Sequence, residues 1–331
     1  MSTVLLVVVV AVALGFDFTN GFHDTANSIA TAVGSRALTP RTAVAIAALA
    51  NLGGAFLTTA VAKTVAKGII DAHLATQQTV LAALIGATAW NLTTWWLGLP
   101  SSSSHALIGG LAGAALVQSG SKGVLWHGIA HKVVIPALVA PVIAGTAALL
   151  ILLLLLWLFA RMHPGPANRG FRLGQIASST WVSFNHGAND AQKTMGVIAL
   201  ALVLHSHGNP THLSIPTWVK LSAGLAIGLG TYVGGWRIIR TLGQRIYAID
   251  PPAGFAAQAT AGATIYLATK WGYPLSTTHV VSGAVMGAGA TRRLSAVRWG
   301  IAGNIVIAWL LTIPMAAAVA AALYWPVQAV F

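Results

Sequence analysis

Long apolar runs alternate with short polar segments along the chain. A helix needs about 20 residues to cross the hydrocarbon core of a bilayer. Runs of this kind cover residues 3–33, 42–62, 134–160, 175–205, 217–236 and 299–323. The pattern therefore predicts membrane-spanning helices, and the polar residues inside 3–33 and 175–205 predict that these two are interrupted.

Two further apolar segments are broken near their middle. Residues 78–118 contain "GLPSSSSH" at 98–105, and residues 253–290 contain "GYPLSTTH" at 272–279. Each half is shorter than a span, and a Gly-x-Pro sequence is unfavourable inside a helix. We therefore predict two re-entrant hairpins, which a bilayer tolerates only where the irregular backbone is buried in protein or lines a cavity.

The composition supports an all-α, polytopic membrane protein. Hydrophobic residues make up 56% of the 331 residues, and charged residues only 7%. The absence of cysteine excludes disulfides and thiolate metal sites. The net charge of +13 does not indicate nucleic acid as a partner, because the basic residues lie in short loops between apolar runs, as beside a membrane surface. The N-terminus lacks the marks of a cleaved signal, so we expect it to stay as part of the first span.

The arginines predict the orientation of the chain. They form four groups: Arg36 and Arg41; Arg161, Arg169 and Arg172; Arg237, Arg240 and Arg245; Arg292, Arg293 and Arg298. If each hairpin returns to the side that it left, all four groups lie on one face, which the positive-inside rule makes cytoplasmic. Both termini are then outside the cell (inner) membrane, and the two hairpins enter from opposite sides.

Two pairs of motifs recur in the same order. "FTNGFHDTAN" at 18–27 aligns with "FNHGANDAQK" at 184–193, and the two hairpin motifs align with each other. We therefore predict a first repeat over 1–160, a cytoplasmic linker over 161–174 and a second repeat of opposite orientation over 175–331. The first repeat carries its Asp motif at 20–28 and the second at 185–193. Inverted repeats with discontinuous helices are typical of secondary transporters whose site lies at the membrane midplane.

Two of the five acidic residues, Asp24 and Asp190, occupy equivalent positions inside apolar segments. An ionisable group there costs roughly 2.5 to 3.5 kcal/mol, which favours a functional role over a structural hydrogen bond at a helix break. Asp beside amides suits a small hard cation or a proton. Lys193 replaces the equivalent of Asn27 and could pair with Asp190, in the place of a bound cation, or extend toward the membrane interface. The candidates for the coupling ion are Asp24, Asn27, Asp190, Gln192 and Lys193.

The hydroxyl runs of the hairpins point to an anion. They come immediately before helical patterns, where unpaired backbone N–H groups and the positive end of the helix dipole favour an oxyanion. The alternative is that they only cap these helices. The candidate anion ligands are Ser102, Ser103, Ser104, Ser276, Thr277 and Thr278. His105 and His279 follow the hydroxyls and could contact the anion, titrate, or pack the hairpin tips. The remaining candidates for proton or anion contacts are Asn20, His23 and Asn189.

The four motifs, "NGFHDTANSIATAV", "HGANDAQKTMGVIAL", "GLPSSSSH" and "GYPLSTTH", resemble those of the Pit family of inorganic phosphate transporters, over nearly the whole chain. The resemblance implies a phosphate importer of inverted repeats, often a homodimer, with phosphate held between the hairpin tips. It places Ser102, Ser103, Ser104, Ser276, Thr277 and Thr278 on phosphate. It places Asp24, Asn27, Asp190 and Gln192 on the cation side.

Lys193 differs from the sodium-coupled members, which usually repeat Asn at this position. A lysine here resembles the bacterial proton-coupled members, which move metal–phosphate complexes. We therefore expect proton-coupled, low-affinity phosphate uptake, with sodium as the alternative coupling ion and a divalent metal as a candidate passenger. No cofactor is expected. The short linker leaves no room for an inserted regulatory domain, so a regulator would be a separate soluble protein.

Two other classes of function fit the motifs less well. An intramembrane hydrolase would use the adjacent Ser and His of the hairpin tips, but it needs a serine held against a base and an oxyanion hole, and no G-x-S-x-G occurs. A divalent-metal transporter would use the eleven histidines, but His205, His207 and His212 lie in a loop without ligand spacing to the Asp motifs. We predict a transporter and no enzyme.

Overall fold

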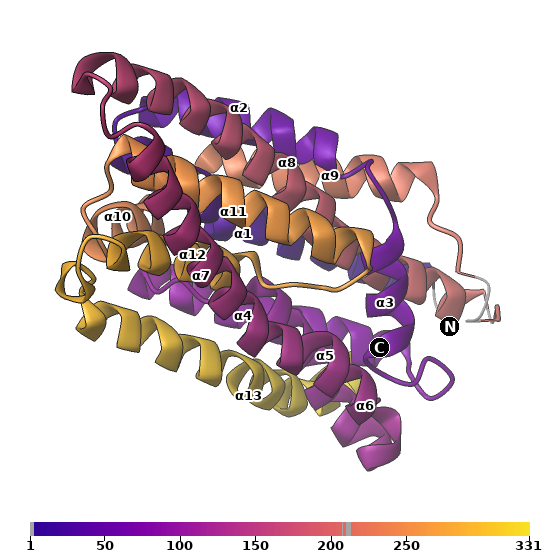
Figure 1. Cartoon of the computed structure of the whole chain (residues 1–331). Helices are drawn as coiled ribbons and strands as arrows, with labels where there is room; N and C mark the ends of the chain where they lie inside the picture. Colours follow the sequence, from indigo (N-terminus) through magenta and orange to yellow (C-terminus); the bar gives the residue numbers. More distant parts are fainter. Residues whose placement is uncertain (1–2, 207, 210–212) are drawn as a thin grey trace.

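The computed structural model describes residues 3–206, 208–209 and 213–331, and within them the fold is all-helical, as predicted (Figure 1). The α-helices are α1 (Thr3–Gly34), α2 (Pro40–Gly54), α3 (Ala60–Gly68), α4 (Gln77–Leu97), α5 (Ser103–Ser119), α6 (Trp126–Ile129), α7 (Ile135–Leu158), α8 (Pro164–His205), α9 (Thr217–Val233), α10 (Trp236–Arg240), α11 (Pro251–Lys270), α12 (Thr277–Ala290) and α13 (Trp299–Val330). Two π-helical turns, η2 (Ala130–Val134) and η3 (Thr241–Arg245), and two 3₁₀ turns, η1 (Gly120–Gly123) and η4 (Leu294–Ala296), complete the described elements.

Four of the described helical stretches are long and apolar enough to cross a membrane. They are Thr3–Gly34, Gln77–Leu97, Trp126–Leu158 and Trp299–Val330. Large apolar side chains on α7 and α13, such as Leu138, Val142 and Leu310, are exposed, which is the surface that a lipid environment requires. The span expected at 42–62 is two shorter helices, α2 and α3, because the chain leaves the helix between Gly54 and Ala60.

The two hairpins break at the expected places. The chain turns between α4 and α5, and again between α11 and α12. Gly98 and Gly272 adopt positive φ values of 68° and 75°, which glycine reaches without strain and which end the preceding helix. One expectation is wrong, since α4 with 21 residues and α11 with 20 are as long as a span rather than half of one.

The Asp motifs lie in continuous helices, so the predicted interruptions of 3–33 and 175–205 are wrong: α1 and α8 run unbroken through them. Their glycines serve close packing instead. A Cβ added at Gly21 would come within 3.0 Å of the carbonyl oxygen of Ile227 on α9, and one at Gly187 would do the same at Asn51 on α2. The predicted linker is also shorter than expected, because α8 already begins at Pro164, behind the cap formed by His163.

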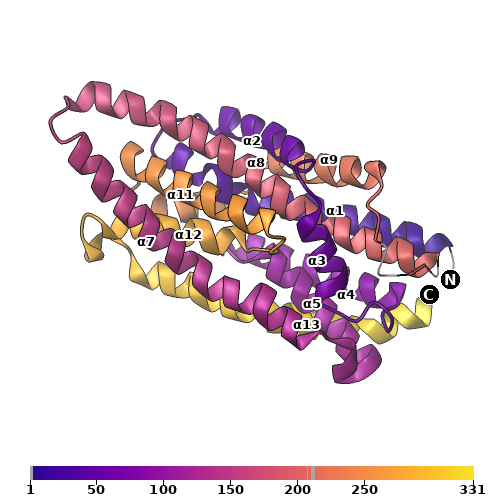
Figure 2. The same ribbon diagram turned by 45° about the vertical axis from the view of Figure 1, so that its right-hand side comes forward.

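The polar middle of the molecule lies between two apolar cores. One core takes the first half of α1, from Leu5 to Phe16, and the last part of α8; the other takes α1 from Ala26 and α8 at Val182. Between them, α1 packs against α8, α9 and α4, while α8 also packs against α2 and α11. Figures 1 and 2 show both chain ends at one end of the bundle, and the α7–α8 and α12–α13 connections at the other.

Candidate functional site

The centre of the site is a chain of ionisable groups on α1 and α8. His186 Nε2 lies 3.3 Å from Asp190 Oδ2 and 4.0 Å from Asp24 Oδ2. All three side chains are at most 3% exposed. Because one atom from each lies within 4.8 Å of the others, the three could hold a metal ion, with two hard oxygens and one imidazole nitrogen as donors.

His186 is not among the site residues predicted from the sequence. Its Nδ1 lies 2.8 Å from Oδ1 of Asn51, whose Nδ2 donates to Thr231 Oγ1, so the amide orientation makes Nδ1 the donor. The Nε2 atom is thereby turned toward the two carboxylates. The signal was present in the sequence, since His186 is four residues before Asp190 and thus on the same helix face.

Lys193 lies inside the protein rather than at an interface. Its side chain is 2% exposed, and Nζ lies 2.5 Å from Asp190 Oδ1. The same ammonium donates to Ser104 Oγ at the first hairpin tip and to the carbonyl oxygen of Leu275 at the second, the latter at 3.0 Å. The predicted pairing with Asp190 is present, and the same ammonium also joins the second Asp motif to both hairpins, which was not predicted.

Asn27 makes the equivalent contact on the other side. Its Nδ2 donates to Oγ1 of Thr278 at 2.9 Å and of Thr277 at 3.2 Å. In the motif alignment Asn27 corresponds to Lys193, and Thr278 corresponds to Ser104. Each Asp-motif helix therefore reaches with the same position to the hairpin of the other half.

The hydroxyls of the tips divide into two kinds. Ser102 and Ser276 are N-caps, since their oxygens accept from the backbone N–H of His105 and His279; contact of these two with an anion stays a prediction. The remaining four side chains lie in the first turns of α5 and α12, where backbone N–H groups lack intrahelical acceptors. They are Ser103, Ser104, Thr277 and Thr278, all at most 2% exposed. The two tips touch, because Ser104 donates to the Leu275 carbonyl at 3.3 Å.

Three of the remaining predicted residues hold the hairpins or a neighbouring helix. His23 lies 2.6 Å from Asp24 Oδ1 and 3.0 Å from Thr94 Oγ1 on α4. Asn189 donates to Thr269 Oγ1 on α11 and to the carbonyl of Tyr273. Gln192 does not face the site: its Oε1 accepts from the N–H groups of Val61 and Ala62 and so caps α3. Asn20 is buried on α1, and its Oδ1 has no hydrogen-bond partner among the described residues.

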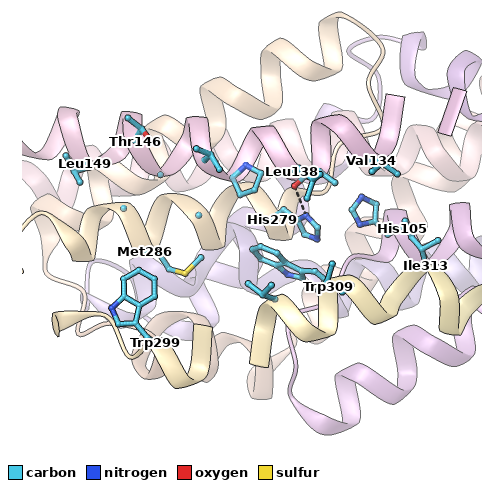
Figure 3. A pocket seen from close by; sticks show the side chains of 18 residues that line it. His105, Val134, Leu138, Thr146, Leu149, His279, Met286, Trp299, Trp309 and Ile313 are labelled. Atoms are coloured by element: carbon cyan, nitrogen blue, oxygen red, sulfur yellow. Dashed lines mark hydrogen bonds between the residues drawn. The ribbon is translucent and has the colours of Figure 1, made fainter. Parts of the chain in front are cut away.

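The two imidazoles behind the tips pack against each other. His105 and His279 form an edge-to-face pair with ring centroids 4.7 Å apart, and His279 stacks on Trp309 at 4.0 Å. Figure 3 shows His279 between His105 and Trp309, at the wall of a cavity of about 610 Å³ that α7, α12 and α13 line with mostly apolar side chains. His279 Nδ1 lies 3.3 Å from the Ala137 carbonyl.

This arrangement gives no support to the hydrolase alternative. Ser103 Oγ has no hydrogen-bond partner in the described part of the chain, and His279 is oriented by a backbone carbonyl rather than by a serine. A nucleophile held against a base is therefore not formed at Ser103. Of the loop histidines, His205 ends α8, whereas His207 and His212 lie outside the described residues.

A bundle of helices that exposes apolar surface and encloses a buried polar site defines a polytopic membrane protein. The chain belongs to the phosphate transporter family, whose model matches residues 20–168 and 160–320. The resemblance to the Pit family of phosphate transporters is thereby confirmed.

Curated relatives match over nearly the full chain. A "Probable low-affinity inorganic phosphate transporter" of Mycobacterium bovis is 52% identical over 324 residues, which cover 97% of this chain and 77% of the relative. A protein of the same name from Bacillus subtilis is 42% identical over 99% of this chain and 98% of the relative. A solved structure described as "The sodium-dependent phosphate transporter" superposes with a TM-score of 0.92 at 29% identity, over 99% of this chain and 100% of the other.

Proposed function

We propose that this protein is a secondary active importer of inorganic phosphate that works by alternating access and is coupled to protons. The observation that carries the proposal is the meeting of two helix starts, those of α5 and α12, at a buried point between the Asp-motif helices. Family membership and the names of the relatives support phosphate as the substrate.

The donors at this point suit a tetrahedral oxyanion. Four hydroxyls and the first N–H groups of two helices converge there, and each helix start adds the positive end of its dipole. Lys193 adds one full positive charge within reach of Ser104. Phosphate binds when the hydroxyls turn their protons toward its oxygens, and Ser104 gives up its bond to the Leu275 carbonyl. Asn27 and Lys193 go on donating to the hydroxyl oxygens and hold the tips in place.

Lys193 favours the proton over sodium as the coupling ion. Its ammonium lies against Asp190 Oδ1, Ser104 Oγ and the Leu275 oxygen, three oxygens of the kind that ligate a small hard cation. A sodium ion has no place there while the ammonium remains. Sodium coupling is the alternative, and the solved structure described as a sodium-dependent transporter is the reason to test it.

The proposal includes the organisation predicted from the sequence. The crosswise contacts of Asn27 and Lys193, and the paired hairpins, support two inverted repeats that share a midplane site. The four arginine-bearing connections would face the cytoplasm of the cell membrane, and the termini the outside. A homodimer and a separate soluble regulator rest on the family resemblance alone.

A metal–phosphate complex is a second candidate cargo. Asp24, His186 and Asp190 could hold a divalent ion close to the tips that we assign to phosphate. Uptake of phosphate and of the metal, with and without Mg²⁺ or Zn²⁺, distinguishes the two cargoes. A complex carries metal inward in proportion to phosphate, whereas free phosphate does not.

The coupling experiment uses the purified protein in proteoliposomes. Uptake of radioactive phosphate is measured under an inward proton gradient without sodium, and under an inward sodium gradient at equal pH. We expect accumulation under the first condition only; a strict sodium requirement would overturn proton coupling.

Substitutions test the phosphate site in the same assay. Ser103→Ala and Thr277→Ala should each weaken phosphate binding, because each removes a donor at a tip, whereas Thr93→Ala on the exposed face of α4 should not. Normal phosphate affinity in both tip variants would refute the site.

A further inference from the structure

A buried carboxylate that the transport scheme above does not use lies on α1. Asp17 precedes Asp24 by seven residues, which is about two helical turns, so both side chains lie on one face of α1. Asp17 is 0% exposed, and neither of its oxygens has a hydrogen-bond partner in the described part of the chain. The same holds for two buried oxygens beside it, Oδ1 of Asn20 and Oγ1 of Thr194 on α8.

The charges around Asp17 do not balance it. Asp24 has His23 and His186 as neighbours, and Asp190 has Lys193 and His186. Asp190 repels a charge on Asp17 and His186 attracts one, but His186 already lies between the other two carboxylates, Asp24 and Asp190.

Apart from α8, the elements packed against α1 supply no counter-charge to Asp17, and α4 among them carries no ionisable side chain. The ionisable side chains on the remaining neighbours are Arg41, His105, Lys220, Tyr232, Arg237, Arg240, Arg245, Tyr266, Lys270 and His279, and none of them forms an ion pair with Asp17 in the described part of the chain. A charge without a partner at this depth is costly, and a carboxylate in such a place takes up a proton instead.

One added proton removes the unpaired charge and supplies the donor that two acceptors, the Asp17 carboxylate and Oδ1 of Asn20, lack between them. After a small rotation of the side chains, a protonated Asp17 would donate its O–H to Oδ1 of Asn20, and the hydroxyl of Thr194 would donate to the second carboxyl oxygen. A metal ion would need more ligands than these four oxygens, and the single carboxylate offers it only one negative charge.

We propose that Asp17 carries the proton that is co-transported with phosphate, held by Asn20 and Thr194. This inference rests on the proposed function and names the group that carries its coupling ion. The proton enters from the external solution, forms the O–H bond of the carboxyl and leaves to the cytoplasm, with no other bond changed. Because phosphate brings negative charge to the same buried region, phosphate and the proton favour each other's binding, and this mutual effect is the coupling.

The test separates exchange from accumulation. Asp17→Asn replaces the protonated carboxyl by a neutral amide of the same shape, and Asp17→Glu keeps an acid. In proteoliposomes of equal protein content, we expect Asp17→Asn to exchange internal for external radioactive phosphate at equal pH but to lose at least tenfold of the accumulation driven by a proton gradient. Asp17→Glu should retain gradient-driven accumulation.

Gradient-driven accumulation by Asp17→Asn decides whether Asp17 carries the proton. The proposal is overturned if Asp17→Asn accumulates phosphate as well as the wild type does. It is also overturned if a sodium gradient drives uptake by the wild type and Asp17→Asn abolishes that uptake, because Asp17 is then a sodium ligand. If the wild type itself ignores the proton gradient, the proposed function fails before Asp17 is tested.

Thr194→Val is the second variant if Asp17→Asn does not fold. It keeps every charge and removes one hydrogen bond to the carboxyl, so it should shift the pH of half-maximal gradient-driven uptake by about half a unit or more. An unshifted pH profile in a folded Thr194→Val protein would also overturn the proposal.

Discussion

The substitution Lys193→Met tests whether the buried ammonium is the counter-charge of Asp190. Removal of one partner from a buried ion pair costs about 3 to 5 kcal/mol, because the other charge stays behind unpaired. His186 remains 3.3 Å from Asp190 Oδ2, so we expect the lower end, about 3 kcal/mol. With an unfolding entropy of about 2.1 cal/mol/K per residue over 331 residues, this loss lowers the unfolding temperature by about 4 °C.

The assay is thermal unfolding in detergent, followed by the monodisperse fraction that survives heating. The double variant Lys193→Met with Asp190→Asn removes both charges and should unfold within about 1 to 2 °C of the wild type, since replacing a whole buried pair is close to neutral. Lys63→Met, at an exposed position of α3, is the matched control and should change stability by less than about 0.5 kcal/mol. A Lys193→Met protein as stable as the control, or a double variant no more stable than Lys193→Met, would show that Lys193 is not the counter-charge of Asp190.

Three further predictions concern the neighbours of the site. Asn27→Ala removes two hydrogen bonds to the second hairpin tip, together about 1 to 3 kcal/mol, and should raise the KM for phosphate about fivefold or more; an unchanged KM would contradict this role. Gln192→Ala removes the acceptor of the Val61 and Ala62 N–H groups at the start of α3 and should cost about 1 to 3 kcal/mol of stability. It should leave phosphate affinity unchanged, which a binding assay on the folded variant checks. Gly21→Ala forces a Cβ against Ile227 and should cost about 1 to 3 kcal/mol, whereas Gly15→Ala on the same helix meets nothing within 4 Å and should be neutral or stabilising in thermal unfolding.

The sequence was most informative where local chemistry decides the structure. Gly98 and Gly272 adopt positive φ, and each stands two residues before a proline, so the hairpin breaks could be placed closely. The all-helical fold followed in the same way from the length of the apolar runs. The continuity of α1 and α8 could not be foreseen, because it depends on what the polar side chains meet. Those of Asp24, Asn27 and Asp190 have hydrogen-bond partners inside the bundle, so the helices can run on through the motifs.

Within the site, helix periodicity was the unused information. Gln192 is two residues from Asp190 and therefore on the opposite side of α8, where it caps α3. His186 and Asp17 are four and seven residues from an Asp of the motifs, and therefore on the same face. What periodicity cannot supply is which groups meet across helices: the contacts of Lys193 with Ser104 and Leu275 depend on the packing of both hairpins.

The position of Lys193 has an electrical consequence. A bound ion that serves as counter-charge travels with the cargo, but an ammonium on a side chain never leaves the protein. If phosphate crosses beside Lys193, the charge moved in each cycle is one positive charge smaller than in a carrier with a mobile ion at the same place. Since each charge that crosses the membrane is worth about 2.3 kcal/mol per 100 mV, the membrane voltage then contributes that much less to phosphate accumulation, and the current per phosphate in a planar bilayer reports the difference.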